Sequence, residues 1–366
     1  MVEVGATLGV EEEYHLVDAA TGELADAPAV VHEANALLGD AAQGEISTSQ
    51  LEIATPVCTG LGEVRAEVLR LRRGVAKAAA EHGCSVLACG THPWSTWRAQ
   101  RLSEGERYAA LHRRWGLMAL QQVIAGCHVH VSVPDPELAV QVLDRLRPDL
   151  PALLALSGSS PYWEGDDTGY DSYRTQWFSR WPVTGPTEVF RTRAAYDETV
   201  ASLVRAGVAD DASHLYWDAR PATRYPTVEV RIADTMPLLD DVFLHAGLAR
   251  ALVQQAAADA VAGLPVPLLR PELARAARWR AARHGLAGDL LDPRTGELVP
   301  AGALVRDLLA RLADPLAITG DTEEVTALAA QVLARGTSAG RQRAVAARHG
   351  PAGVVPAVLA ELDLGG

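Results

Sequence analysis

Acidic residues stand beside an apolar stripe near the start of the chain, in the motif Gly9-Val10-Glu11-Glu12-Glu13. The surrounding segment has an apolar residue at alternate positions, at Leu8, Val10, Tyr14 and Leu16, which is typical of a half-buried strand. Glu11 and Glu13 then share the opposite face, where two carboxylates about 4 Å apart repel by roughly 4 kcal/mol at an effective dielectric of about 20. A divalent cation would turn this repulsion into attraction. Taken alone, the pair also fits a solvated strand face.

Two later segments repeat this arrangement. Residues 50–55 are predicted to form a strand that ends at Pro56 and turns Glu52 away from its apolar neighbours. Residues 126–134 alternate apolar residues with His128 and His130, so both histidines share one face, and imidazole is a versatile metal ligand. An ordinary polar strand face explains each segment, taken singly, about as well.

A fourth strand is predicted at residues 225–234, where Glu229 and Arg231 lie opposite three apolar residues. A weak ion pair on one face is the simplest interpretation of this strand alone. Together, however, four strands would bring acids and a histidine to one sheet face, and such a face would hold divalent ions. Ligation rich in carboxylates favours Mg²⁺ or Mn²⁺ over zinc, and such sites commonly bind nucleotide phosphates with an arginine nearby. The residues that would meet there are Glu11, Glu13, Glu52, His128 and Glu229.

Helices must support these strands. Helical periodicity predicts helices at residues 30–38, 61–82, 104–123 and 239–261, and a mostly helical chain from residue 238 onward. Residues 157–190 are rich in aromatic residues, glycine and arginine, which predicts an irregular but ordered wall of a binding site. Arginines in such a wall suit carboxylate or phosphate groups.

Composition excludes several classes of function. The net charge of −13 argues against nucleic acid or an anionic membrane as the main partner. Lys77 is the only lysine, which excludes a Walker A phosphate-binding loop. No signal peptide or long apolar run is visible. Four cysteines without Cys-x-x-Cys spacing predict reduced thiols in a cytoplasmic protein.

The motifs in chain order resemble the glutamate–cysteine ligase type 2 family, the YbdK-like carboxylate–amine ligases. The resemblance covers most of residues 5–260, and its motifs are Gly-Val-Glu-Glu-Glu, Glu45 to Pro56, Gly-Cys-His-Val-His-Val, Ser-Ser-Pro-Tyr-Trp, Asp-Ser-Tyr-Arg and Thr-Val-Glu-Val-Arg-Ile-Ala-Asp. It implies an α+β, glutamine-synthetase-like fold, in which a curved, mainly antiparallel sheet carries helices on its outer side. We expect one domain over residues 1–366, with residues 1–236 bearing the sheet and residues 237–366 forming a mainly helical layer.

The resemblance also implies roles for individual residues. The metal ligands would be Glu11, Glu13, Glu45, Glu52, His128 and Glu229. Arg231 would bind the ATP phosphates and Arg174 the substrate carboxylate, so both would take part in catalysis. His130 is not carried over as a ligand. Glu12 falls on the apolar side of its strand and is the least suited of the three consecutive glutamates.

The implied activity joins the γ-carboxylate of glutamate to the amine of cysteine, or of a similar amine, through an acyl phosphate. It requires ATP and Mg²⁺, with Mn²⁺ as an alternative, and it leaves room for a homo-oligomer. Three alternatives stay open at this point. The same residues could serve a metal-dependent hydrolase, a non-catalytic binding protein, or a ligase that uses another pair of small molecules.

Overall fold

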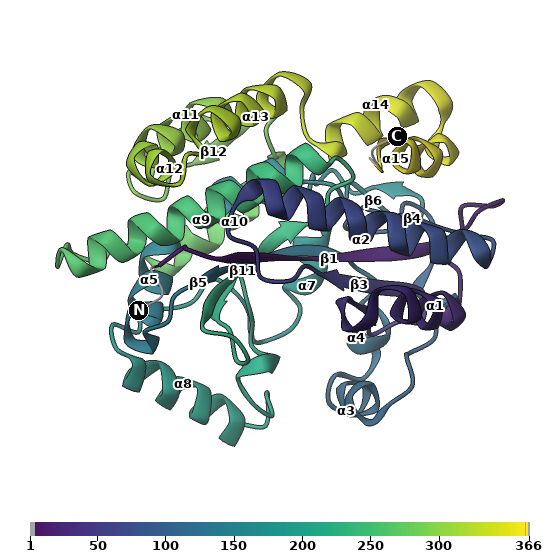
Figure 1. Cartoon of the computed structure of the whole chain (residues 1–366), viewed down its shortest axis with the longest axis horizontal. Helices are drawn as coiled ribbons and strands as arrows, with labels where there is room; N and C mark the ends of the chain where they lie inside the picture. Colours follow the sequence, from purple (N-terminus) through teal and green to yellow (C-terminus); the bar gives the residue numbers. More distant parts are fainter. Residues whose placement is uncertain (1–3, 363, 365–366) are drawn as a thin grey trace.

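A sheet of seven strands forms the centre of the computed structural model, which describes residues 4–362 and 364 (Figure 1). The strand order is β10-β11-β5-β1-β3-β2, and β4 also pairs with β1. All neighbours in this sheet are antiparallel. The strands are β1 (Leu8–Asp18), β2 (Ala42–Gly44), β3 (Gln50–Ala54), β4 (Cys84–Leu87), β5 (Gly126–Ser132), β10 (Ala219–Pro221) and β11 (Thr227–Asp234).

The register of the sheet brings the predicted site residues together in pairs. Glu11 lies opposite His128, Glu13 lies opposite Glu52, and Glu229 lies opposite His130. Directly opposed residues in an antiparallel pair share one face. The four strands predicted from alternation therefore carry these polar side chains on one face of one sheet.

The other face of the sheet is covered by helices. The alternate residues of β1, β5 and β11 are buried in a large apolar core that includes residues from α5 (Pro136–Leu146), α6 (Leu150–Ser157) and α9 (Leu239–Val261). Helix α2 (Leu61–Glu81) lies beside α9 in this layer, above β1 in Figure 1. The predicted helices 61–82 and 239–261 are confirmed.

An ion pair is buried between β1 and this helical layer. Glu12 and Arg72 of α2 are both fully buried and hydrogen-bond at 2.5 and 3.0 Å, and Tyr14 donates to the same carboxylate at 2.5 Å. Arg72 also donates to the carbonyls of Met236 and Pro237, at 2.7 and 2.6 Å. Glu12 therefore joins β1 to α2 and to the turn before α9, and it points away from Glu11 and Glu13.

The other helices and short strands surround this centre. The helices are α1 (Pro28–Leu38), α3 (Glu106–Trp115), α4 (Leu117–Leu120), α7 (Tyr173–Phe178), α8 (Arg193–Arg205), α10 (Pro271–His284), α11 (Ala301–Arg311), α12 (Ala313–Thr319), α13 (Thr322–Arg335), α14 (Ser338–His349) and α15 (Val354–Glu361). The short strands are β6 (Tyr162–Trp163) with β7 (Asp166–Asp167), β8 (Thr184–Gly185) with β9 (Tyr216–Trp217), and β12 (Asp289–Leu291) with β13 (Leu298–Pro300). Only β8 and β9 pair in parallel among the strands of the described residues.

Two expectations from the sequence are corrected. The helix predicted at 104–123 is wrong, because Gly116 adopts a left-handed φ of 55° and separates α3 from α4. The segment 157–190 is less irregular than predicted, since it contains α7 and the short strands β6, β7 and β8. The prediction of a single domain stays a prediction.

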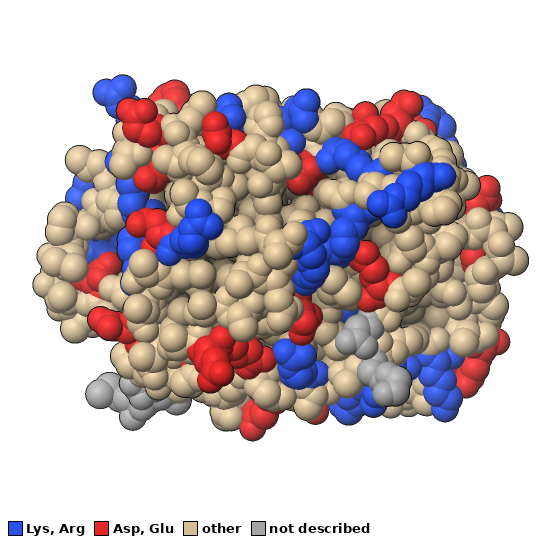
Figure 2. Space-filling view, turned by 90° about the horizontal axis from the view of Figure 1, so that it is seen from above, with Lys and Arg blue, Asp and Glu red and all other residues tan. Residues whose placement is uncertain are grey.

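Two features bear on the predicted partners. Within residues 4–362 and 364, no helix combines the length and apolarity needed to span a bilayer. On the face shown in Figure 2, basic and acidic side chains are interspersed.

We expect Arg72→Met to lower the free energy of unfolding by about 3–5 kcal/mol, because it leaves the Glu12 carboxylate buried without its partner. Urea unfolding followed by circular dichroism measures this loss. Arg70→Met is a matched control on the same helix, since Arg70 pairs at 2.7 Å with Glu67 near the surface and should contribute less than about 1 kcal/mol. Equal losses in the two variants would contradict the role given to the buried pair.

Candidate active site

One cluster of possible metal ligands joins three strands of the sheet. Ligand atoms of Glu11, His130 and Glu229 all lie within 4.8 Å of one another. His130 Nε2 is 3.1 Å from Glu11 Oε1 and 4.0 Å from Glu229 Oε1. His130 Nδ1 is 3.0 Å from the hydroxyl of Thr227, which orients the ring. The histidine that the resemblance left aside is thus placed among the acids.

A second cluster consists only of carboxylates. Ligand atoms of Glu13, Glu45 and Glu52 also lie within 4.8 Å of one another. Glu13 accepts a hydrogen bond from the backbone N–H of Gly126 at 2.6 Å, and Glu45 accepts one from Ile46 at 3.0 Å. These bonds hold two of the three carboxylates toward the third.

His128 lies between the two clusters. Its Nδ1 is 3.2 Å from Glu11 Oε2 and its Nε2 is 3.7 Å from Glu13 Oε1. The ring is almost fully buried, and Nε2 has no hydrogen-bond partner among the described residues. A buried ring nitrogen that faces a carboxylate without bonding to it fits a ligand position for a cation.

The two clusters differ in electrostatics. In the carboxylate cluster, burial and the charge of Glu13 raise the pKa of Glu45, and burial and Glu45 raise that of Glu52 well above its usual value. In the first cluster, burial also raises the pKa of Glu11, but contacts with the two histidines lower it by more. Hydrogen bonds with His128 and His130 hold the pKa of Glu11 well below its usual range.

Glu229 is surrounded by positive charge. Burial would raise the pKa of Glu229, but Arg231 and Arg220 hold it well below its usual range. Arg231 forms an ion pair with Glu229 from the same strand, and Arg220 of β10 donates to it at 2.8 Å. The Arg231 side chain is only 12% exposed, and its Nε has no hydrogen-bond partner within the described part of the chain. It is therefore placed beside the acids with a free donor, as a phosphate-binding arginine would be.

Arg174 of α7 lies at the other end of this face. Its side chain is buried, donates a hydrogen bond to the carbonyl of Ile232 at 3.4 Å, and lies 3.9 Å from the Asp234 carboxylate. Burial lowers the pKa of Arg174, opposed by Asp234 and Glu13. Its Nε has no partner among the residues described. A weakly paired, buried guanidinium can take an anionic ligand.

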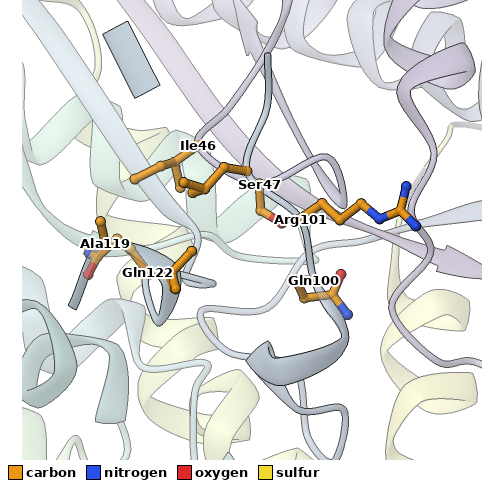
Figure 3. Close-up of a pocket in the computed structure, with 8 residues that line it drawn as sticks. Ile46, Ser47, Gln100, Arg101, Ala119 and Gln122 are labelled. Atoms are coloured by element: carbon orange, nitrogen blue, oxygen red, sulfur yellow. The ribbon is translucent and has the colours of Figure 1, made fainter. Parts of the chain in front are cut away.

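The segment that carries α3 and α4 covers the Glu45 side of the site. Tyr108 donates from its hydroxyl to the carbonyl of Gly44 at 2.9 Å, and Ser103 donates to the carbonyl of Glu45. Ile46 and Ser47 line a narrow crevice together with residues 100–102, Ala119, Leu120 and Gln122 (Figure 3). The broken helix thus forms an edge of the acid-lined face.

The structure places the eight predicted site residues on or beside one face of the sheet. Arg220 was missed, because it lies in a three-residue strand without a motif, and only its pairing with β11 brings it to Glu229. His130 could have been included from alternation alone, since it follows His128 on the same face. The roles given to all eight residues stay predictions.

The donor set fits magnesium or manganese. Five carboxylates converge with two imidazoles, and oxygen-rich sets suit these hard cations. Burial and the neighbouring carboxylates raise the pKa values of Glu45 and Glu52, and the charge of Arg107 only partly opposes this at Glu45. A divalent cation would supply further positive charge.

The fold resembles that of a solved ligase. Glutamate–cysteine ligase from Francisella tularensis, solved in complex with AMP, superposes with a TM-score of 0.72 at 15% sequence identity, over 98% of this chain and 88% of that one. The predicted α+β fold class is confirmed. The sheet and its helical layer give the chain the same fold as this protein.

Sequence comparison identifies the family. The family model described as glutamate–cysteine ligase family 2 matches residues 7–355. A protein of Salinispora arenicola provisionally named glutamate–cysteine ligase 2 is 44% identical over 93% of this chain and 90% of its own length. A Frankia alni protein provisionally named glutamate–cysteine ligase 2-2 is 43% identical over 94% and 93%. The chain belongs to glutamate–cysteine ligase family 2, and it is an ATP-dependent ligase that forms a C–N bond.

Stability of the metal-free protein should fall as pH rises above the ordinary glutamate pKa of about 4.3. The folded state keeps protons on Glu45 and Glu52 that the unfolded chain has released, so the slope of unfolding free energy against pH is negative there. The pKa values of Glu11 and Glu229 are lowered, so the stability that these two groups contribute is lost as the pH falls below the ordinary glutamate value. Urea unfolding in EDTA between about pH 5 and pH 8 measures the slope.

Glu52→Gln is the control for this prediction, because it removes the carboxyl group with the strongly raised pKa. The variant should have a flatter slope, and saturating Mg²⁺ should flatten the slope of the wild type. A slope unchanged by Glu52→Gln would show that other groups cause it.

Proposed function

We propose that this enzyme joins the γ-carboxylate of glutamate to the amine of cysteine, with ATP and Mg²⁺, through an acyl-phosphate intermediate. One observation supports this most: two clusters of possible metal ligands share one sheet face with Arg231 and Arg174, and the Nε of each arginine has no hydrogen-bond partner among the described residues. Such a face can hold cations, nucleotide phosphates and an anionic substrate together. The family match and the names of the relatives supply the substrate pair.

The acids on the sheet have a binding role in this proposal. Glu11, His130 and Glu229 would hold one Mg²⁺ ion, and Glu13, Glu45 and Glu52 would hold another, with His128 between them. Bound Mg²⁺ supplies positive charge that neutralises the phosphate oxygens of ATP. Because the carboxylates are fixed by strand register and by backbone N–H groups, little reorganisation is needed as charge shifts during phosphoryl transfer.

The arginines have complementary roles. Arg231 would donate to the transferring phosphate, and Arg220 would keep Glu229 ionised and oriented. Arg174 would bind the α-carboxylate of the acid substrate, which leaves its γ-carboxylate free to attack the γ-phosphorus of ATP and release ADP. The amine then attacks the acyl carbonyl, loses a proton and expels phosphate. Positioning of the reactants supplies much of the rate enhancement in such a reaction.

The proposed route needs no protein nucleophile. All four cysteines are free and buried. Burial raises the pKa of each thiol above its ordinary value, so the thiols stay protonated. Reduced, unreactive thiols also suit the cytoplasmic location that we propose. The cysteines are thus structural in this account.

Glu13→Gln and Glu229→Gln should each lower ATP-dependent product formation by about 10³-fold, because each removes a charge that would balance Mg²⁺. A coupled assay for ADP together with mass detection of the amide product measures this. Glu323→Gln, at an exposed position on α13, is the matched control and should keep the wild-type rate. Near-wild-type turnover in either site variant, with the fold intact by circular dichroism, would overturn the assignment of the site.

An ADP-release screen over amino-acid carboxylates and amines tests the substrate pair. We expect glutamate with cysteine to give the highest rate and an equimolar yield of ADP and amide. A higher rate with another pair would keep the mechanism and replace the substrates. Hydrolysis of an amide without ATP would support the metal-dependent hydrolase instead, and no reaction with any pair would support a binding protein.

A further inference from the structure

Gly126, the first residue of β5, touches both halves of the site. Its backbone N–H donates to Glu13 at 2.6 Å. An ideal Cβ at this position would lie 2.8 Å from the guanidinium carbon of Arg174, 3.1 Å from its Nε and closer still to Nη2. Contacts under 3.0 Å are essentially never made by a real Cβ. The space that a side chain would fill is therefore occupied by the Arg174 guanidinium.

The backbone of Gly126 does not itself require glycine. It pairs within the strand opposite Asp234, and it is not among the glycines with positive φ. An alanine could adopt this conformation. The requirement at position 126 is for space and not for backbone freedom.

A β-bulge in β11 places Asp234 beside Gly126. Val230 pairs with Val129 and Ala233 pairs with Cys127, so β11 has one residue more than β5 between these pairs. Such an extra residue reverses which side chains face each side of the sheet. Asp234 consequently shares the face of Gly126, whereas simple alternation would have placed it with Val230 and Ile232.

Asp234 fixes the segment that carries Arg174. Its buried carboxylate accepts from the hydroxyls of Ser160 and Ser172, at 2.6 and 2.7 Å. Ser160 in turn accepts from the backbone N–H of Arg174 at 3.0 Å. The start of α7 is thus attached to β11, and the Arg174 side chain is directed across Gly126.

We propose that Gly126 is a positioning residue that seats the Arg174 guanidinium beside the Glu13 carboxylate. The inference rests on the proposed function, since it gives Arg174 the anionic substrate and Glu13 the cation. One backbone N–H and one missing side chain then set the separation between the metal-binding acid and the arginine that binds substrate. Gly126 acts through these two groups and does not touch the reacting atoms.

Gly126→Ala is the direct test, because it keeps the N–H that holds Glu13 and adds only a methyl group against Arg174. A misplacement of about 1 Å can cost roughly 100-fold in rate. We expect a loss of that size in kcat/KM for the acid substrate, carried mainly by KM. The Mg²⁺ affinity, measured by calorimetry without substrate, should stay within about twofold of the wild type.

A double-mutant cycle separates this role from a general loss of structure. If Gly126 acts through Arg174, Gly126→Ala/Arg174→Ala should be no slower than Arg174→Ala alone. Gly340→Ala, where the added methyl group meets nothing within 4 Å, should match the wild type. Additive losses in the double variant, or an unchanged KM in Gly126→Ala, would overturn the proposal.

A crystal structure of Gly126→Ala gives a readout that does not depend on activity. We expect the Arg174 guanidinium to be displaced while Glu13 keeps its bond to the backbone N–H of residue 126. An unmoved Arg174 would refute the positioning role even if no substrate pair reacts. A displaced Arg174 in an enzyme inactive with every pair would instead locate the failure in the proposed function.

Discussion

Repulsion between carboxylates is the constraint on which the rest of this structure depends. Five glutamates converge on one face of the sheet. Among the described residues, no lysine or arginine forms an ion pair with Glu13, Glu45 or Glu52, and only the His128 ring approaches Glu13, at 3.7 Å. The fold maintains this unfavourable arrangement because β1 is attached to the helical layer on the opposite face of the sheet. Glu12, the residue between Glu11 and Glu13, is tied to Arg72 in the helical layer. Strand register and core burial thus hold together charges that would separate in a free peptide.

The same arrangement explains why the two clusters on this face differ in charge balance. Glu229 and Glu11 are kept ionised by arginines and histidines, whereas Glu45 and Glu52 have raised pKa values. The negative charge of Glu11 and Glu229 is therefore balanced by side chains of the protein, whereas the cluster that contains Glu45 and Glu52 needs a bound cation. Arg174 and Arg231, each with an Nε that has no hydrogen-bond partner among the described residues, add sites where anions can bind. A ligand that brings both cations and phosphates, as ATP with Mg²⁺ does, would complete the charge balance.

Much of this could be predicted from the sequence because strands impose a period of two. Alternation placed Glu11 and Glu13 on one face and Glu12 on the other, and the register confirms this. Alternation could not show Arg220, which reaches Glu229 only through pairing of a very short strand. A bulge shifts the period at Asp234, for which alternation made no prediction. Helical periodicity failed at Gly116, where one left-handed residue divides the predicted helix. Pairing, bulges and helix breaks depend on contacts distant in sequence, which local periodicity does not contain.

Anomalous diffraction from crystals soaked with Mn²⁺ and a non-hydrolysable ATP analogue would show directly whether the two clusters bind cations beside the nucleotide. Mn²⁺ has the ligand preferences of Mg²⁺ in such sites and scatters strongly enough to be located. We expect one peak among Glu11, His130 and Glu229 and another among Glu13, Glu45 and Glu52, with the analogue's phosphates beside Arg231. Ordered analogue density with no manganese peak within ligand distance of either cluster would contradict this expectation.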